Sequence, residues 1–173
     1  MVKVEQQKIL LAHGSGGLLY HQLIEEVFLP VYGSHELSKL NDAAVLESDG
    51  KNLAFTTDSF VVRPRFFPGG DIGRLSVCGT VNDLAMSGAR PCWLSVGMII
   101  ETGFAISELR QIAASIAAAA EEANIAVVTG DTKVVEKGAC DGIYINTAGV
   151  GIFERGTYTP SGNLVEGDKI IIS

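Results

Sequence analysis

Four aspartates stand where apolar stretches of the sequence give way to polar or glycine-rich ones: Asp42, Asp58, Asp83 and Asp131. Carboxylates at such positions suit a hard cation, because Mg²⁺ takes oxygen ligands and usually keeps several waters. A cation also lets carboxylates lie beside the anionic oxygens of a phosphate. The pattern therefore predicts a site for Mg²⁺ and phosphate. Taken singly, each aspartate is more simply explained as a turn former or cap, although Asn82-Asp83 interrupts an otherwise apolar helix face.

A glycine-rich stretch, His13-Gly14-Ser15-Gly16-Gly17, precedes a predicted helix. Free backbone N–H groups at a helix start bind anions, so this loop could cradle phosphates. It is neither a P-loop, which needs GxxxxGK[ST], nor a dinucleotide GxGxxG loop. A hydrolase elbow would need glycine where His13 stands. Lys133, in Gly130-Asp131-Thr132-Lys133, could neutralise phosphate charge. A mobile surface loop and a solvated lysine are the simpler interpretations of each feature alone.

Composition excludes several classes of protein. The 173 residues are 47% hydrophobic, enough for one domain with a substantial core. The net charge of −7 and the lack of a basic stripe predict that the chain binds no nucleic acid. A polar amino terminus and short apolar runs predict neither a signal peptide nor a membrane span, and hence a cytoplasmic setting. The three cysteines form no CxxC pair, so neither a zinc site nor a disulfide framework is expected.

The elements that must position these residues alternate between strands and helices. Periodicity and breakers predict helices over 18–29, 72–87 and 108–123 and strands over 9–12, 43–47, 53–57, 93–100, 125–129 and 142–153. Asp71 and Ser107 are expected to cap helices, Pro30 to end the first one, and 48–51 to form a hairpin turn.

This order mixes hairpins with helical crossovers. It predicts an α/β fold of the α+β type, in which helices cover one face of a mixed sheet. The tail 167–173 begins another apolar strand and then stops. We therefore expect one domain over 1–165 and the start of a truncated second domain over 166–173.

Several segments together resemble one family. They are HGSGG at 13–17, TDSFVV at 57–62, FFPGGDIG at 66–73, GTVNDLA at 79–85 and GDTKVV at 130–135. The combination resembles the hydrogenase expression/formation (HypE) family, within the superfamily of aminoimidazole ribonucleotide synthetase (PurM) and selenophosphate synthetase. The resemblance covers nearly the whole chain, whereas Asn-Asp-Leu alone would mark only the superfamily. It implies a PurM N-terminal-like domain whose sheets pair into a barrel-like homodimer.

The resemblance also implies ATP and Mg²⁺ as cofactors and assigns residues to them. It implies metal ligands at Asp42, Asp58 and Asp83, and catalytic roles for Asp83 and Lys133. The match at Asn41-Asp42 is looser, because relatives often carry two acids there. The residues implied for ATP binding are His13, Gly14, Ser15, Gly16, Gly17, Asn82, Asp131, Thr132 and Lys133.

The implied activity belongs to [NiFe] hydrogenase maturation. A carbamoyltransferase partner, HypF, loads a carboxy-terminal cysteine, ATP-dependent dehydration turns the thiocarboxamide into a thiocyanate, and cyanide passes on through a HypC–HypD complex. This sequence ends at Ser173 without such a cysteine, so the chain is expected to bind ATP but to be inactive alone. Two alternatives remain. A selenophosphate synthetase would be expected to carry a reactive Cys or selenocysteine near the glycine-rich loop, and a non-catalytic module would only dimerise or dock a partner.

Overall fold

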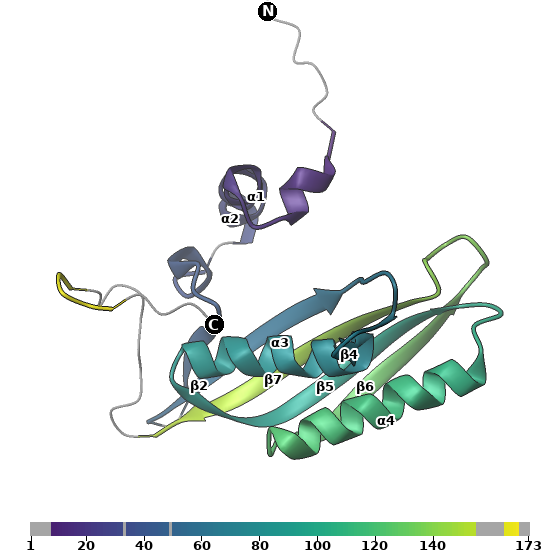
Figure 1. Ribbon diagram of the computed structural model, residues 1–173. Helices are drawn as coiled ribbons and strands as arrows, with labels where there is room; N and C mark the ends of the chain where they lie inside the picture. The colour runs from purple at the N-terminus through teal and green to yellow at the C-terminus, as the bar shows by residue number, and fades with distance from the viewer. Residues whose placement is uncertain (1–7, 33, 49, 155–164, 170–173) are drawn as a thin grey trace, which may run out of the picture. The chain divides into compact units, whose positions relative to one another are not determined.

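The computed structural model describes residues 8–32, 34–48, 50–154 and 165–169. The chain divides into two compact units, 1–40 and 41–173, which are described separately below. The first unit is built of short helical segments (Figure 1). In chain order they are a 3-10 helix Leu11–Gly14, α1 Leu18–Leu23, a π-helical turn Ile24–Phe28, α2 Leu29–Tyr32 and a 3-10 helix Leu37–Lys39.

Two predictions for the first unit are wrong. The strand expected over 9–12 is replaced by the 3-10 helix Leu11–Gly14, because the His13 N–H donates to the Leu10 carbonyl at 3.0 Å and closes a local turn. The helix expected from residue 18 forms, but Pro30 does not end it. Pro30 is the second residue of α2, directly after the π-helical turn. The helical run continues from α1 through the π-helical turn, where the Leu29 N–H donates to the Ile24 carbonyl, and such an irregular turn accommodates the proline that follows it.

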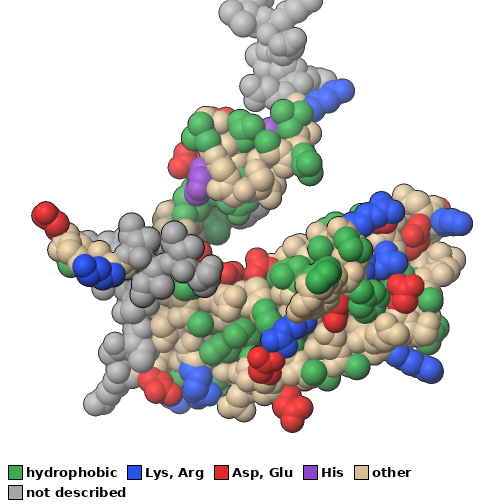
Figure 2. Space-filling view, in the orientation of Figure 1, with side chains coloured by type: hydrophobic (Ala, Val, Ile, Leu, Met, Phe, Trp, Pro, Cys, Tyr) green, Lys and Arg blue, Asp and Glu red, His purple; other side chains and the backbone are tan. Residues whose placement is uncertain are grey.

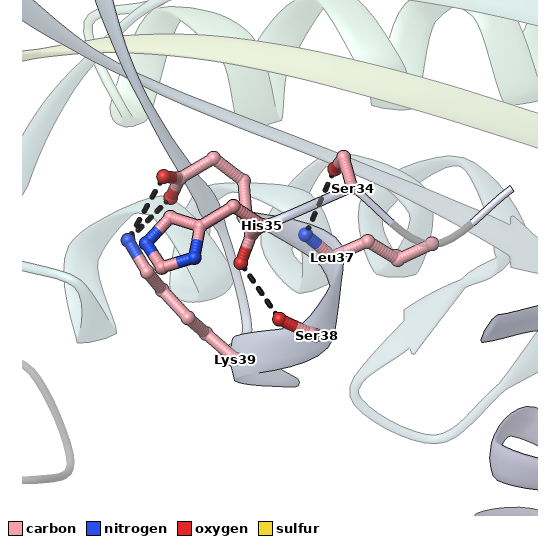
Figure 3. A network of polar contacts seen from close by, with 6 residues as sticks. Ser34, His35, Leu37, Ser38 and Lys39 are labelled. Carbon is pink, nitrogen blue, oxygen red and sulfur yellow. Dashed lines mark hydrogen bonds and ion pairs between the residues drawn. The ribbon is translucent and has the colours of Figure 1, made fainter.

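The segment that ends this unit is held by local polar contacts (Figure 3). The Lys39 ammonium pairs with the Glu36 carboxylate at 2.7 Å, and the Leu37 N–H donates to the Ser34 hydroxyl at 3.2 Å. Leu40 follows with a left-handed backbone, at φ 50°. Such a backbone is uncommon for a residue other than glycine, and here it lies at the boundary between the units.

The main unit is a five-stranded mixed sheet in the order β1-β2-β7-β5-β6. The pair β5 and β6 is parallel and the other pairs are antiparallel. This confirms the predicted mixed sheet, and the hairpin between the first two strands. The strands are β1 Ala44–Ser48, β2 Lys51–Phe60, β5 Ala89–Glu101, β6 Ala126–Val135 and β7 Ile143–Phe153, with a small ribbon of β3 Phe66–Phe67 and β4 Gly70–Asp71 beside them.

Two helices, α3 Ile72–Met86 and α4 Ile106–Glu122, cover the same face of this sheet, as predicted (Figure 1). Asp71 caps α3, because its carboxylate accepts the N–H groups of Gly73 at 2.7 Å and Arg74 at 3.1 Å. Ser107 does not cap α4, which begins at Ile106 without a side-chain cap. The apolar core fills the layer between sheet and helices, and its fully buried members include Ile72, Val77, Leu94 and Ile112.

Several strands run past the polar residues at which they were expected to end. Asp58 lies inside β2, and Asp131 and Lys133 lie inside β6. Pairing with neighbouring strands extends them, and such tertiary context overrides local propensity. At Gly130 the backbone approaches β5 so closely that a Cβ would lie 2.4 Å from the Val96 carbonyl oxygen. A glycine in a strand often marks such a close approach.

On the face of the main unit shown in Figure 2, acidic and basic side chains are interspersed. Of the predicted tail strand over 167–173, only 167–169 are described, and there the Asp168 N–H closes a turn onto the Val165 carbonyl at 3.2 Å. The rest of that prediction lies outside the described residues. Among the helices that the structure describes, none is long and apolar enough to cross a membrane.

Candidate functional site

Two of the predicted aspartates meet between β2 and α3. Along β2 the buried residues Ala54 and Thr56 alternate with exposed ones, which places Asp58 on the same face, toward the helices. On α3, a Cβ at Gly79 would lie 3.7 Å from the Asp58 carboxylate. Asp83 follows Gly79 by four residues, about one helical turn. Strand and helix therefore bring Asp58 and Asp83 to one place.

The electrostatics of Asp83 report this encounter. The pKa of Asp83 is raised to about 6, chiefly by burial and next by the negative charge of Asp58. The charge of Asp42 and a side-chain hydrogen bond with Asp58 add smaller upward shifts of this pKa, while the hydrogen bond from Thr56 opposes them. A carboxylate whose charge is disfavoured by like charges is one that a cation would stabilise.

Thr56 joins this site, although the sequence argument did not select it. Its hydroxyl lies 2.9 Å from the Asp42 carbonyl oxygen and 3.1 Å from the Asp83 carboxylate. Because Thr56 and Asp58 are two residues apart on one strand, the sequence could have placed them on the same face. A threonine inside a strand has so common a structural explanation, however, that nothing in the sequence distinguishes this one.

Asp42 is not part of a close carboxylate cluster among the described residues, although its charge affects the pKa of Asp83. In the described ranges no three His, Cys, Asp or Glu side chains are grouped closely enough to hold one metal ion. Yet the charge of Asp42 still acts on Asp83. The two observations agree if distance is considered, since Coulomb interactions reach much farther than a coordination bond. We therefore treat Asp58 and Asp83 as the assembled pair and the exposed Asp42 as an outlying carboxylate.

The strand register separates Asp131 and Lys133 from this pair. Asp58 is paired with Thr147, Thr147 with Val96, and Val96 with Gly130. Three inter-strand steps of roughly 4.8 Å place β6 about 14 Å from Asp58 across the sheet.

Asp131 and Lys133 also point the other way. Gly130 is paired with Val96, which lies in the core on the helix side of the sheet. Asp131 and Lys133 alternate with Gly130 along the strand, so both face away from the helices, and both are exposed. Thr132, between them, is exposed as well. Within one chain the structure does not bring the β6 residues together with Asp83.

The glycine-rich loop belongs to the other unit. As predicted, it leads directly into a helix, because α1 begins at Leu18. Gly16 has φ 73°, a left-handed conformation that favours glycine, and no atom lies within 4 Å of where its Cβ would be. Gly14, Ser15 and Gly17 are likewise exposed, and His13 is half-buried. Asn82, next to Asp83 on α3, is exposed.

A cavity of about 450 Å³ lies elsewhere and contains none of the predicted site residues. It is lined by Arg63, Pro64, Arg65, Phe66, Glu108 and Gln111. Arg65 pairs with Glu108 at 3.2 Å and stacks over Phe104 at 5.1 Å, and the exposed Arg63 pairs with Asp141 at 3.4 Å. Each arginine thus already has a carboxylate partner.

Comparison with known proteins shows which family the chain resembles. The family model of the AIR synthase related protein, N-terminal domain, matches residues 40–153. The chain is 49% identical to the carbamoyl dehydratase HypE of Rhodobacter capsulatus over 98% of its own length, and 45% identical to that of Escherichia coli K12 over 95%.

Solved structures are similar too. A HypE-HypF complex aligns with 79% of the chain at 51% identity and a TM-score of 0.74. The hydrogenase maturation protein HypE in complex with ATP aligns with 85% of the chain at 52% identity and a TM-score of 0.60. The chain covers only 44% of each of these structures and 51% of the Rhodobacter protein, so it spans about half the length of the relatives it matches.

Proposed function

Because the chain belongs to the AIR synthase related family, we propose that it is the ATP-binding half of a carbamoyl dehydratase that matures [NiFe] hydrogenases. The observation that carries the proposal is the meeting of Asp58 and Asp83 between β2 and α3. Relatives about twice as long as this chain are named carbamoyl dehydratases, and one solved HypE structure is a complex with ATP. Since the chain spans about half of them, activity, substrate and partners are proposed for the whole protein.

The residues fit Mg²⁺ in the form in which nucleotide enzymes bind it. Mg²⁺ is usually held by one or two carboxylates, several waters and the phosphates of a substrate, and not by a complete protein cage. A pair of carboxylates without a third close ligand matches that chemistry. Asp58 and Asp83 would hold the ion, and Asp42 would reach it directly or through water.

Asp131, Thr132 and Lys133 call for a different arrangement. Asp131 and Lys133 point to the sheet face opposite α3 and α4, here called the open face, whereas Thr132 between them points to the other face. We propose that two chains pair through their open faces, so that Asp131 and Lys133 lie at the interface of a homodimer and Thr132 lies beside them on the same strand.

A row of apolar side chains supports that pairing. Phe55, Val150 and Trp93 are neighbours across β2, β7 and β5, and all point to the open face. Phe55 and Trp93 are 42% and 44% exposed, which is unusual for aromatic side chains of this size. Covering such a patch is favourable by roughly 25 cal/mol for each Å² of apolar surface removed from water.

The remaining predicted residues complete the proposed nucleotide site. His13, Gly14, Ser15, Gly16 and Gly17 would offer backbone N–H groups to the triphosphate, as anion-binding loops before helices do. Asn82 would donate from α3 beside Asp83. Residues 166–173 would begin a second domain. A cytoplasmic location and partners corresponding to HypF and a HypC–HypD complex complete the proposal, and one solved relative is a HypE-HypF complex.

The proposed reaction removes water from a thiocarboxamide. The amide oxygen attacks the γ-phosphate of ATP, and ADP leaves. Phosphate is a far better leaving group than hydroxide, so loss of phosphate and of the nitrogen-bound protons gives the nitrile. Mg²⁺ held by Asp58 and Asp83 would neutralise phosphate charge. Lys133 would contribute a second positive charge near the phosphates, and catalysis would rest on positioning and electrostatics.

Calorimetric titration with Mg-ATP tests the proposal. We expect the chain to bind Mg-ATP, and Asp58→Asn and Asp83→Asn each to weaken binding by about tenfold or more, because each removes a charged ligand. Glu121→Gln, an exposed charge loss on α4, is the matched control and should bind as the wild type does. No binding by the wild type, or equal binding by all variants, would favour a non-catalytic docking module.

A further inference from the structure

Thr56 contacts the site from the strand side. Its side chain is only 7% exposed, between the sheet and α3. Through one hydroxyl it touches two parts of the chain, the Asp42 carbonyl 14 residues before it and the Asp83 carboxylate 27 residues after it. Those two aspartates are the ones that flank Asp58 in the proposed cation site.

The two contacts cannot be donated at the same moment. A hydroxyl has one proton, and both the carbonyl oxygen of Asp42 and an ionised Asp83 are acceptors. The hydroxyl therefore alternates between them, or donates to one while its oxygen lies beside the other. In either case it ties the segment that enters β1 to the carboxylate on α3. This contact matters because Asp42 lies just before β1 and is exposed, so the strand pairing of β1 does not itself fix its position.

We propose that Thr56 is a positioning residue of the cation site. Its hydroxyl keeps the backbone at Asp42 and the carboxylate of Asp83 within reach of one Mg²⁺-phosphate unit, and without it Asp42 swings away from the pair. This inference rests on the proposed function, since it concerns the same Mg-ATP site. The hydroxyl is the essential group, and the methyl group only fills space.

The neighbouring threonine provides a matched control. Thr57 lies in the same strand, and its hydroxyl donates to the Thr147 carbonyl at 3.0 Å and accepts from the Asn146 amide at 3.3 Å. Thr57→Val thus removes two hydroxyl hydrogen bonds from β2, and neither involves the Asp42 carbonyl or the Asp83 carboxylate. Thr56→Val keeps the shape of the side chain and removes its hydroxyl, whereas Thr56→Ser keeps the hydroxyl and removes the methyl.

The experiment titrates Mg-ATP into the wild-type chain and these variants. We expect Thr56→Val to weaken affinity by about tenfold, which is the size of effect that a hydrogen bond to a charged group allows. Thr56→Ser and Thr57→Val should stay within about threefold of the wild type. A Thr56→Val variant that binds as the wild type does, or a Thr56→Ser variant that loses as much, would overturn the inference.

A second readout does not depend on nucleotide. Amide hydrogen exchange over 42–44, where the chain enters β1, should be faster in Thr56→Val than in the wild type and unchanged in Thr56→Ser, because the hydroxyl holds the Asp42 carbonyl. If the wild type fails to bind Mg-ATP, the proposed function fails, and the exchange measurement alone decides the inference. Equal exchange in the valine and serine variants would then reject it.

Discussion

The hydroxyls of Thr80 and Thr147 are hydrogen-bonded at 2.6 Å, and both side chains are fully buried. Thr147 donates its proton to the Ser76 carbonyl at 3.0 Å, so Thr80 must be the donor in the contact between the hydroxyls. This pair fixes α3 on β7 in the middle of the core. Thr147 is also the residue paired with Asp58, so the same contact sets the helix over the proposed site.

Removing either hydroxyl should therefore lower stability by different amounts. Thr80→Val leaves Thr147 with its own acceptor, so we expect a loss of about 1 kcal/mol in the free energy of unfolding. Thr147→Val leaves the Thr80 donor and the Ser76 carbonyl without this partner, so we expect about 1–3 kcal/mol. Urea denaturation followed by circular dichroism measures both. A larger loss for Thr80→Val than for Thr147→Val would contradict the assignment of donor and acceptor.

The pH dependence of stability should report Asp83. Its pKa is raised to about 6 in the folded chain, chiefly by burial and then by Asp58, whereas in an unfolded chain it is about 3.9. The folded state therefore holds the proton more tightly. The stabilisation from this group is fully present below about pH 4 and is lost as pH rises through about 6. Asp83→Asn cannot ionise, so without metal its stability relative to the wild type should increase between these pH values.

Thermal denaturation at pH 4 and at pH 7, in the presence of a chelator, measures this difference. Addition of Mg²⁺ and ATP at pH 7 should stabilise the wild type more than the Asn variant, because the cation replaces the proton. A difference in melting temperature between the two proteins that does not change with pH would show that Asp83 has an ordinary pKa.

The open face should control the oligomeric state. Trp93→Arg places a charge in the apolar row of Phe55, Val150 and Trp93, and we expect it to weaken the proposed dimer by about thirtyfold or more. Leu75→Arg is the matched control, since Leu75 is also partly exposed, at 39%, but lies on α3. Analytical ultracentrifugation over a range of concentrations measures both. A wild-type monomer, or a dimer that Leu75→Arg disrupts and Trp93→Arg does not, would place the interface elsewhere.

The glycine-rich loop should be sensitive to a side chain at residue 16. Gly16→Ala forces alanine into a left-handed backbone, which costs roughly 1–2 kcal/mol, so we expect a several-fold weaker affinity for Mg-ATP. Gly50→Ala is the matched control. Its φ of 72° is nearly the same and space around it is also open, but it lies in the turn between β1 and β2. Equal effects of the two substitutions on affinity would remove the loop from the site.

Much of the main unit could be predicted because local chemistry and tertiary packing agree there. The hairpin of β1 and β2 has turn residues between apolar runs, and α3 has a true cap in Asp71 and a glycine at its end, Gly88, with φ 83°. Apolar residues of α3 and α4 pack with apolar residues of the strands in one core, which holds both helices on one face of the sheet. Each of these features is written within a few residues of its position in the sequence.

The features that escaped prediction depend on partners distant in the chain. Asp131 looks like a residue of a loop after a short strand, but pairing with Gly97 extends that strand past it. Thr56 becomes a site residue only when Asp42 and Asp83 are brought to it by the hairpin and by α3. Ser107 has the right side chain for a cap, yet α4 starts at Ile106, one residue too early for Ser107 to cap it.

The strand that carries Asp131 and Lys133 has one further consequence for the solution behaviour of the chain. Among the described strands β6 pairs only with β5, so its other side presents backbone N–H and C=O groups that any extended segment could join. The exposed valines at 127, 128 and 134 would favour pairing of this edge with a strand of another chain. The charges of Asp131 and Lys133 on this strand oppose such pairing. Replacing both with uncharged residues should therefore promote fibrous aggregation, whether or not nucleotide is present.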